Sequence, residues 1–175
     1  MLRTQRLTLK PYRKRDRQNM IELLTNEQIK KTFMIPDFAT RREAVAAFDK
    51  LYEYAHSDAH YEMGVYLDDA MIGFFNDVEI GDGFIEVGYV IHPAHQGRGY
   101  ATEALAAVLG DLFDRGFREV RTAAFRHNLP SRRVMEKCGM RMTDETESYL
   151  YHGKQEECVC YAIEQEAWRE RDARP

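Results

Sequence analysis

The stretch Ile91-His92-Pro93-Ala94-His95-Gln96-Gly97-Arg98-Gly99-Tyr100-Ala101-Thr102 decides how the rest of the chain is interpreted. The apolar run at residues 87–91 leads into it as a strand, and the longest helical pattern of the chain follows it. A helix begins with four N–H groups that have no partner inside the helix, and its dipole adds partial positive charge there. Two glycines keep this junction uncovered and Arg98 adds charge, so the stretch predicts a site for a phosphate group.

Length and composition indicate one globular domain over residues 1–175. The 175 residues suffice to bury a substantial core. Hydrophobic residues make up 44% of the chain and charged residues 31%, which is ordinary for a soluble globular protein. The formal net charge of −4 argues against a general nucleic-acid binder, because affinity for a phosphate backbone needs a basic surface.

The cysteines and the N-terminus indicate a cytoplasmic protein. Cys138, Cys158 and Cys160 are an odd number without CxxC spacing, which favours reduced thiols over a disulfide framework or a zinc site. We therefore expect no metal. The N-terminus has no apolar signal core, and no apolar run approaches the length of a membrane span.

The front third predicts one strand and three helices. Alternation over residues 3–12 is typical of a half-buried strand. Asp16 can cap a helix with apolar positions at residues 20–24, and a short helix over 27–33 follows. Thr40 and Glu43 have the spacing of a capping box before a longer helix.

The remainder predicts six further strands. Residues 61–67, 71–80 and 84–91 indicate three consecutive antiparallel strands, and 119–125 could lie parallel to the third because a long helix ending near Gly116 connects them. A short helix runs from Asn128 to Gly139, and the last strands cover 141–151 and 156–163. We expect the polar tail from Glu164, which carries Trp168, to fray after Trp168. The result is an α/β (α+β) fold, a mixed and mostly antiparallel sheet of about seven strands flanked by helices.

Two phosphate-loop patterns do not match the glycine stretch. A P-loop needs GxxxxGK[ST], and no lysine followed by serine or threonine is present after these glycines. A dinucleotide-binding fold needs a third Gly or Ala where Thr102 stands, and its loop follows the first strand of a βαβ unit rather than a third antiparallel strand.

The remaining pattern, Gln96-x-x-Gly99-x-Ala101, resembles the acetyl-coenzyme A pyrophosphate loop of the GNAT acetyltransferase superfamily. The resemblance extends to Arg6-Leu7-Thr8-Leu9, to Glu86-Val87-Gly88-Tyr89-Val90-Ile91, and to Asn128-x-x-Ser131 with Glu136-Lys137-Cys138-Gly139-Met140. These stretches are similar to the RimJ/RimL-like branch, the type that acetylates ribosomal-protein N-termini. The resemblance implies the GNAT fold.

The resemblance also implies how acetyl-coenzyme A (acetyl-CoA) would bind. The pyrophosphate would accept hydrogen bonds from the N–H groups of Gly97, Arg98, Gly99, Tyr100 and Ala101, between Gln96 and Thr102. The pantetheine arm would run along the preceding strand, near Val90, Ile91 and His92.

Glu86 is the candidate general base. It lies on the same strand face as Gly88 and Val90, and it could take a proton from an amine or hold a cationic one. The alternative, a solvated strand carboxylate, stays open. Glu147 is a weaker candidate for the same role. A backbone N–H near Val90 or Ile91 would stabilise the thioester oxygen as negative charge develops on it.

Ser131 is the candidate group that stabilises the leaving thiolate. Many members of the superfamily place a tyrosine seven residues after the asparagine, but here Met135 stands there and cannot donate a proton. In the RimJ/RimL-type branch the serine three residues after the asparagine has this role, and Ser131 occupies that position. A first-turn serine that satisfies the backbone is the alternative. Asn128 could cap the helix, contact pantetheine, or do both.

The sequence thus predicts an N-acetyltransferase in which a primary amine attacks acetyl-CoA directly. The acceptor is a protein N-terminal amine or a small molecule. A non-catalytic acyl-CoA sensor is the alternative, and a nicotinamide or nucleotide enzyme is a third class. Neither His92, His95 nor Cys138 is expected to be catalytic. The apolar late strands also allow a homodimer.

Overall fold

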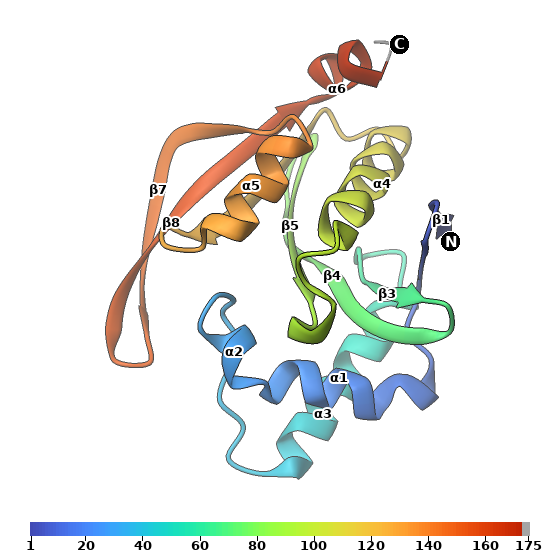
Figure 1. Ribbon diagram of the computed structural model, residues 1–175, viewed down its shortest axis with the longest axis vertical. Coiled ribbons are helices and arrows are strands. Elements are labelled where there is room, and N and C mark those ends of the chain that lie inside the picture. Colours follow the sequence, from blue (N-terminus) through green and yellow to red (C-terminus); the bar gives the residue numbers. More distant parts are fainter. Residues whose placement is uncertain (173–175) are drawn as a thin grey trace. The chain divides into compact units, whose positions relative to one another are not determined.

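The computed structural model describes residues 1–172. Figure 1 labels most of its strands and helices. The strands are β1 (Leu2–Arg3), β2 (Leu7–Lys10), β3 (Met63–Leu67), β4 (Ala70–Ile80), β5 (Phe84–Ile91), β6 (Glu119–Phe125), β7 (Arg141–Tyr151) and β8 (Lys154–Glu164). The helices are α1 (Arg17–Thr25), α2 (Glu27–Lys30), α3 (Arg41–Tyr54), α4 (Tyr100–Asp114), α5 (Leu129–Lys137) and α6 (Gln165–Asp172), with 3-10 turns η1 (Lys14–Asp16) and η2 (Pro93–His95).

The strands form an eight-stranded sheet in the order β1-β2-β3-β4-β5-β6-β8-β7. Most neighbours whose register is defined are antiparallel, such as β2 with β3 and β6 with β8. β5 and β6 are parallel, with Phe84 opposite Glu119 and Glu86 opposite Arg121. The predicted fold class and the predicted parallel pair are confirmed.

The sheet has eight strands rather than about seven because the first predicted strand is broken. The Thr4 N–H donates to the Leu7 carbonyl at 3.0 Å and forms a turn. β1 and β2 then pair with each other, Leu2 opposite Leu9. Alternation alone did not reveal this turn, since it contains neither glycine nor proline.

The backbone divides into two compact units. The first unit comprises Met1–Asp77 and Tyr89–Ala104, and the second comprises Val78–Gly88 and the chain from Leu105 onward. Each is described by itself below. That residues 1–175 make one domain stays a prediction.

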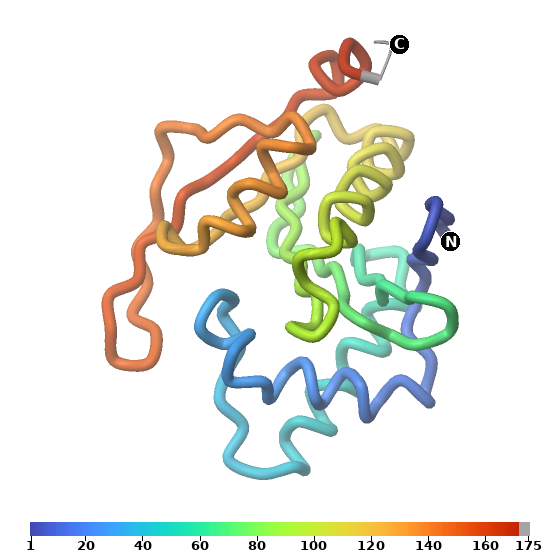
Figure 2. Tube along the Cα trace, in the orientation of Figure 1, coloured from blue at the N-terminus to red at the C-terminus, as the bar shows by residue number. Residues whose placement is uncertain are grey.

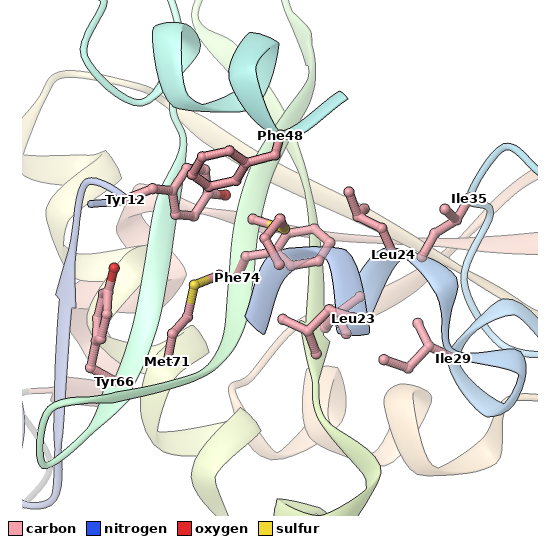
Figure 3. Close-up of a cluster of buried hydrophobic side chains, with 11 residues drawn as sticks. Tyr12, Leu23, Leu24, Ile29, Ile35, Phe48, Tyr66, Met71 and Phe74 are labelled. Carbon is pink, nitrogen blue, oxygen red and sulfur yellow. The ribbon is translucent and has the colours of Figure 1, made fainter. Parts of the chain in front are cut away.

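The core of the first unit is a cluster in which α1 and α3 meet the sheet (Figure 3). Leu23 of α1, Phe48 of α3 and Phe74 of β4 are each at most 3% exposed. Burying such a side chain stabilises the fold by about 1.5–3 kcal/mol. α3 begins as the capping-box spacing predicts, because the Thr40 hydroxyl accepts a hydrogen bond from the Glu43 N–H.

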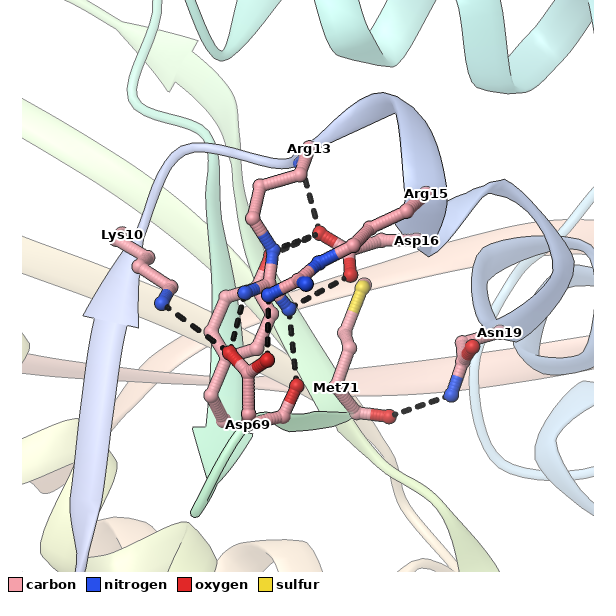
Figure 4. A network of polar contacts seen from close by, with 8 residues as sticks. Lys10, Arg13, Arg15, Asp16, Asn19, Asp69 and Met71 are labelled. Carbon is pink, nitrogen blue, oxygen red and sulfur yellow. Dashed lines mark hydrogen bonds and ion pairs between the residues drawn. The ribbon is translucent and has the colours of Figure 1, made fainter.

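Asp16 precedes α1, but the prediction that its side chain caps this helix is wrong. The carboxylate instead accepts hydrogen bonds from Tyr66 Oη at 2.6 Å and from Arg13 N at 2.7 Å (Figure 4). Burial raises the pKa of Asp16, but the hydrogen bonds from Arg13 and Tyr66 outweigh it and leave the pKa lowered. Arg13 also contacts Asp69, so this network ties η1 to the turn between β3 and β4.

The part of α4 that belongs to the second unit, from Leu105 onward, is buried at Leu105, Leu109 and Leu112. Gly116 ends this helix as predicted, with φ of 96° and its N–H bonded to the Phe113 carbonyl. Figure 1 shows the long β7–β8 hairpin of this unit in orange and red.

The prediction that the tail frays after Trp168 is wrong up to Asp172, because α6 covers Gln165–Asp172. The Gln165 N–H donates to the Arg118 carbonyl at 2.9 Å. The ring of Trp168 packs against Phe113 at a centroid distance of 6.2 Å. This contact with α4 supplies the apolar partner that the polar sequence of the tail did not indicate.

Candidate functional site

The end of β5 lies tightly against β4 in the first unit. Val90 and Ile91 are each 5% exposed. A Cβ at Gly73 would come within 2.1 Å of the Val90 carbonyl oxygen, so only glycine permits this approach. The His92 N–H donates to the Ile72 carbonyl at 2.7 Å. The His92 carbonyl oxygen accepts from the His95 N–H at 2.8 Å, so its second lone pair is the backbone acceptor left for a ligand.

The segment between β5 and α4 is held by its own side chains. His92 Nδ1 accepts a hydrogen bond from the Ala94 N–H at 3.2 Å, and His92 Nε2 lies 3.1 Å from Glu22 Oε1. Gln96 Nε2 donates to the Ile91 carbonyl at 2.8 Å. These contacts fold the chain back on the end of the strand, so the glycines that follow start from a defined position (Figure 2).

The glycine loop, residues 96–102, presents unused backbone donors. Gly97 and Gly99 have φ of 74° and 82°, in the region that glycine adopts without strain. Within residues 1–172, the N–H groups of Gly97, Arg98, Gly99, Tyr100 and Ala101 have no hydrogen-bond acceptor. The first bond of α4 runs from the Glu103 N–H to the Gly99 carbonyl at 3.0 Å. Five consecutive donors at the start of a 15-residue helix have the geometry that suits an anion.

His95 lies beside this loop but is not a cationic donor. Its Nδ1 is buried and has no partner among the described residues. Burial lowers the pKa of His95, and the neighbouring His92 and Arg98 lower it further. The ring therefore stays neutral near pH 7.

Glu86 is half-buried on β5 in the second unit. Burial raises the pKa of its carboxyl group, as do the charges of Glu147, Glu79 and Glu145, while Arg121 lowers it. The Glu86 carboxylate accepts no hydrogen bond from another residue within 1–172. A carboxylate with a raised pKa and without such a partner is suited to exchange a proton with a ligand.

Glu147, the weaker candidate, already has a partner. The Tyr149 hydroxyl donates to Glu147 Oε2 at 2.5 Å, and β7 places Glu147 opposite Cys158. Burial, followed by the charge of Glu147, raises the pKa of the Cys158 and Cys160 thiols to about 11. These thiols are therefore protonated at neutral pH and are poor nucleophiles.

Asn128 and Ser131 come together at the start of α5 in the second unit. Asn128 Oδ1 accepts a hydrogen bond from the Ser131 N–H at 3.2 Å, so Asn128 caps this helix. Ser131 is half-buried. Met135 is fully buried at 0% exposure, which explains an apolar residue at that position. Cys138 is also buried, and burial raises the pKa of its thiol to about 11.

The predicted site residues thus fall in both units. The first unit brings together Val90, Ile91, His92 and residues 96–102. The second unit holds Glu86, Asn128 and Ser131. Sequence reasoning missed Arg6 and Glu103, which contact the glycine loop and each other. The signal for Arg6 was the stretch Arg6-Leu7-Thr8-Leu9, which carried the family resemblance without a role, and no pattern pointed to Glu103.

Two other features, a metal cluster and a membrane-spanning helix, are absent from the described part of the chain. Residues 1–172 contain no group of three or more His, Cys, Asp or Glu side chains that could hold a metal ion. None of the helices within the same residues has the length and apolar character to cross a membrane.

Comparison with known proteins points to one family. The sequence model described as "Acetyltransferase (GNAT) domain" matches residues 6–141. The uncharacterized N-acetyltransferase YnaD of Bacillus subtilis (strain 168) is 27% identical over 172 residues, which cover 94% of this chain and 97% of YnaD.

Solved structures share the fold at lower identity. Spermidine N-acetyltransferase from Vibrio cholerae, in complex with CoA and spermine, has a TM-score of 0.81 at 20% identity, over 94% of this chain and 98% of that one. Mycobacterium smegmatis RimJ, in complex with CoA-disulfide, has a TM-score of 0.80 at 23% identity, over 95% of this chain and 88% of that one.

Proposed function

Because the chain belongs to the GNAT family of acetyl-CoA-dependent acyltransferases, we propose that it transfers the acetyl group to a primary amine by direct attack. The observation that carries this proposal is the run of five backbone N–H groups, Gly97 to Ala101, that have no acceptor within residues 1–172. A pyrophosphate is a ligand that such a run of donors fits.

The first unit would bind the cofactor. The N–H groups of the glycine loop would donate to the pyrophosphate, and Arg98 would add positive charge. Gln96 and Thr102 flank these donors. The pantetheine arm would follow the end of β5 at Val90, Ile91 and the His92 carbonyl. That Asn128 contacts pantetheine stays a prediction.

Glu86 would prepare the acceptor. An amine must be neutral to attack, and a carboxylate with a raised pKa can take its proton. Burial raises the pKa of Glu86, and the charges of Glu147, Glu79 and Glu145 raise it further. These negative charges favour an acceptor that arrives as a cation. The bound acetyl-CoA supplies an activated thioester carbonyl.

Ser131 would stabilise the thiolate that leaves. Its N–H is held by Asn128, which fixes the start of α5. A hydroxyl can hydrogen-bond a thiolate in a dry pocket, although serine is a weak acid in water. A backbone N–H of Val90 or Ile91 would donate to the carbonyl oxygen as charge develops on it.

The acceptor class follows from the similar proteins only as a proposal. A protein N-terminal amine, as in the RimJ/RimL-like branch, and a small amine such as spermidine both meet the requirement for a cation. We propose the cytoplasm as the compartment, in keeping with three free cysteines. A homodimer also stays a prediction; β7 exposes Leu150 at 77% and Met142 at 53%, and sedimentation velocity would measure the oligomeric state.

Thiol release from acetyl-CoA tests the function against a panel of polyamines, amino acids, aminoglycosides and N-terminal peptides. We expect turnover with at least one cationic amine. Tight binding of CoA without turnover over the whole panel would favour the sensor alternative. Thermal stabilisation by NAD and not by acetyl-CoA would favour the nucleotide class.

Two substitutions test the catalytic roles. Ser131→Ala should lower kcat and leave the affinity for CoA nearly intact, whereas Ser148→Ala, an exposed serine on β7, is the matched control. Glu86→Gln should lower kcat/KM most at neutral pH, where the carboxylate acts as base. Unchanged turnover in either variant would remove that residue from the mechanism.

A further inference from the structure

Arg6 lies in the turn between β1 and β2 and contacts the glycine loop and the first turn of α4. Its Nη1 donates to the Arg98 carbonyl at 2.9 Å. Its guanidinium carbon lies 4.6 Å from the centre of the Tyr100 ring. Its Nε and Nη2 lie 2.7 Å and 2.6 Å from Glu103 Oε2. One side chain thus joins the loop, the aromatic ring behind it and the helix that follows.

From these contacts we infer that Arg6 is a positioning residue that orients the pyrophosphate donors of the glycine loop. The inference rests on the proposed function, because it assigns Arg6 to the same cofactor site. Arg6 acts through the loop, and its own guanidinium is engaged by Glu103, Arg98 and Tyr100.

The contact with the Arg98 carbonyl fixes the direction of one donor. The peptide between Arg98 and Gly99 is trans, so its C=O and N–H point in opposite directions. Since Arg6 holds the carbonyl, the Gly99 N–H points away from Arg6. Without this contact the peptide between Arg98 and Gly99 could rotate. Gly99 has a φ of 82° and no Cβ, so its own backbone torsions do not hold this peptide in place.

The loop gains little order from packing. Nothing lies within 4 Å of a Cβ built on Gly97, and the nearest atom to a Cβ built on Gly99 is Arg6 Nη2 at 3.3 Å. A loop that is ordered before binding loses less conformational entropy when the ligand arrives. Arg6 therefore adds order to the part of the loop that follows Gln96, whose own side chain is bonded to the Ile91 carbonyl.

Arg6 also balances a charge that would oppose an anionic ligand. Glu103 stands in the first turn of α4, where a free carboxylate would compete for the helix N-terminus. Its Oε1 accepts from Thr4 Oγ1 at 2.6 Å and from the Arg6 N–H at 2.8 Å, and its Oε2 accepts from the guanidinium. Burial raises the pKa of Glu103, but the bonds from Thr4 and Arg6 outweigh it, so the ion pair persists at neutral pH.

The test compares two thioesters, acetyl-CoA and S-acetylpantetheine, which lacks the pyrophosphate. For Arg6→Gln we expect KM for acetyl-CoA to rise about tenfold while kcat stays within about twofold, because donor orientation affects binding of the pyrophosphate. The kcat/KM for S-acetylpantetheine should not change. Arg3→Gln, an exposed arginine on β1 of the same hairpin, is the matched control and should match the wild type.

Two more variants separate orientation from a general loss of structure. Arg6→Lys keeps the charge but cannot reach Glu103 and the Arg98 carbonyl together, so its KM should lie between those of the wild type and Arg6→Gln. Adding Glu103→Gln to Arg6→Gln should recover part of the affinity, because the uncompensated carboxylate is gone. Equal losses with both thioesters would mean a purely structural role and overturn the inference.

Calorimetry with CoA keeps this outcome apart from the proposed function. A wild-type protein that binds no CoA would defeat the proposed function. A wild-type protein that binds CoA, with an Arg6→Gln variant of equal affinity, would defeat only the role of Arg6. We expect the wild type to bind and Arg6→Gln to bind about tenfold more weakly.

Discussion

The starts of α4 and α5 differ in how their backbone donors are satisfied. At α5, Asn128 Oδ1 accepts the Ser131 N–H at 3.2 Å, as in an ordinary capped helix. At α4, five consecutive N–H groups from Gly97 have no acceptor within residues 1–172, and the nearby acid, Glu103, is bonded to Arg6 and Thr4 instead. A capped start stabilises the fold, whereas an open start leaves its donors for a ligand.

Two carboxyl groups show the same difference. Glu62 in the first unit is 6% exposed and accepts a hydrogen bond from the Tyr12 hydroxyl at 2.7 Å. Glu86 in the second unit is half-buried and accepts no hydrogen bond from another residue within 1–172. The pKa of each is raised, but only Glu62 of the two already accepts a hydrogen bond from a neighbouring side chain. Satisfied groups should thus affect stability when changed, and unsatisfied groups should affect function.

The largest effect, on the affinity for CoA, is expected when a capping side chain is added at the start of α4. Gly99→Asp places a carboxylate before Tyr100, where it can accept the donors of α4, and aspartate tolerates positive φ. We expect the affinity for CoA to fall about a hundredfold or more, because hydrogen bonds to a charged ligand contribute about 1.5–3 kcal/mol each. The melting temperature of the free protein should hold. Calorimetry and thermal unfolding measure the two effects.

Two variants serve as controls for this substitution. Gly99→Asn has the same shape without the charge and should lose much less affinity. Gly116→Asp makes the same change after the other end of α4, where φ is 96° and nothing lies within 4 Å of a Cβ built on Gly116. This variant should leave CoA binding unchanged. Full affinity in Gly99→Asp would mean that the open start is not the phosphate site.

The next effect concerns Glu62 and the pH dependence of stability. Burial raises the pKa of Glu62 from 4.5 to about 8. The stability linked to this group is present in full below the unfolded pKa and is lost as the pH rises through about 8. At about 1.4 kcal/mol per pKa unit, the loss amounts to a few kcal/mol. Urea unfolding between about pH 5 and pH 9 measures it.

Glu62→Gln should remove this pH dependence, because glutamine cannot ionise and still accepts from Tyr12. The matched control is Glu53→Gln, an exposed residue of α3, which should follow the wild-type curve. Parallel curves for the wild type and Glu62→Gln would show that Glu62 does not titrate in this range.

A smaller effect is expected at the capped start. Asn128→Ala removes the acceptor of the Ser131 N–H and should destabilise the protein by about 1 kcal/mol. Thermal unfolding should show a decrease of about 2–4 °C for a chain of this size. Asn128→Ser keeps a capping oxygen and should remain near the wild type. If both variants lose equal stability, the cap is not the reason. If Asn128→Ser stays stable but binds CoA more weakly, Asn128 also contacts the ligand.

The sequence predicted those features that depend on neighbouring residues. The capping box joins Thr40 and Glu43, which are three positions apart. The glycine loop is recognised from Gly97, Gly99 and the helix that follows. Such features need only local backbone geometry, which short-range patterns describe.

Other features depend on partners distant in the sequence and were missed. The carboxylate of Asp16 turns to Tyr66, 50 residues away, and Arg6 meets Glu103 across 97 residues. The raised pKa of Glu62 arises mainly from burial, which only the assembled core provides. Composition does not reveal these pairs, because Asp16, Arg6 and Glu103 are each of a type that is ordinarily exposed on the surface.

The smallest expected effect is on the pH dependence of kcat/KM, and it tests whether Glu86 is the general base. Burial is the largest cause that raises the pKa of Glu86, and the charge of Glu147 is the next largest. The charge of Arg121 lowers this pKa. If Glu86 is the base, kcat/KM rises with pH through its pKa. Glu147→Gln should then shift the rising part of the pH profile of kcat/KM, the acidic limb, to lower pH. Arg121→Gln should shift this limb to higher pH. Because the two shifts have opposite signs, a change in the same direction, or none, would assign the limb to another group.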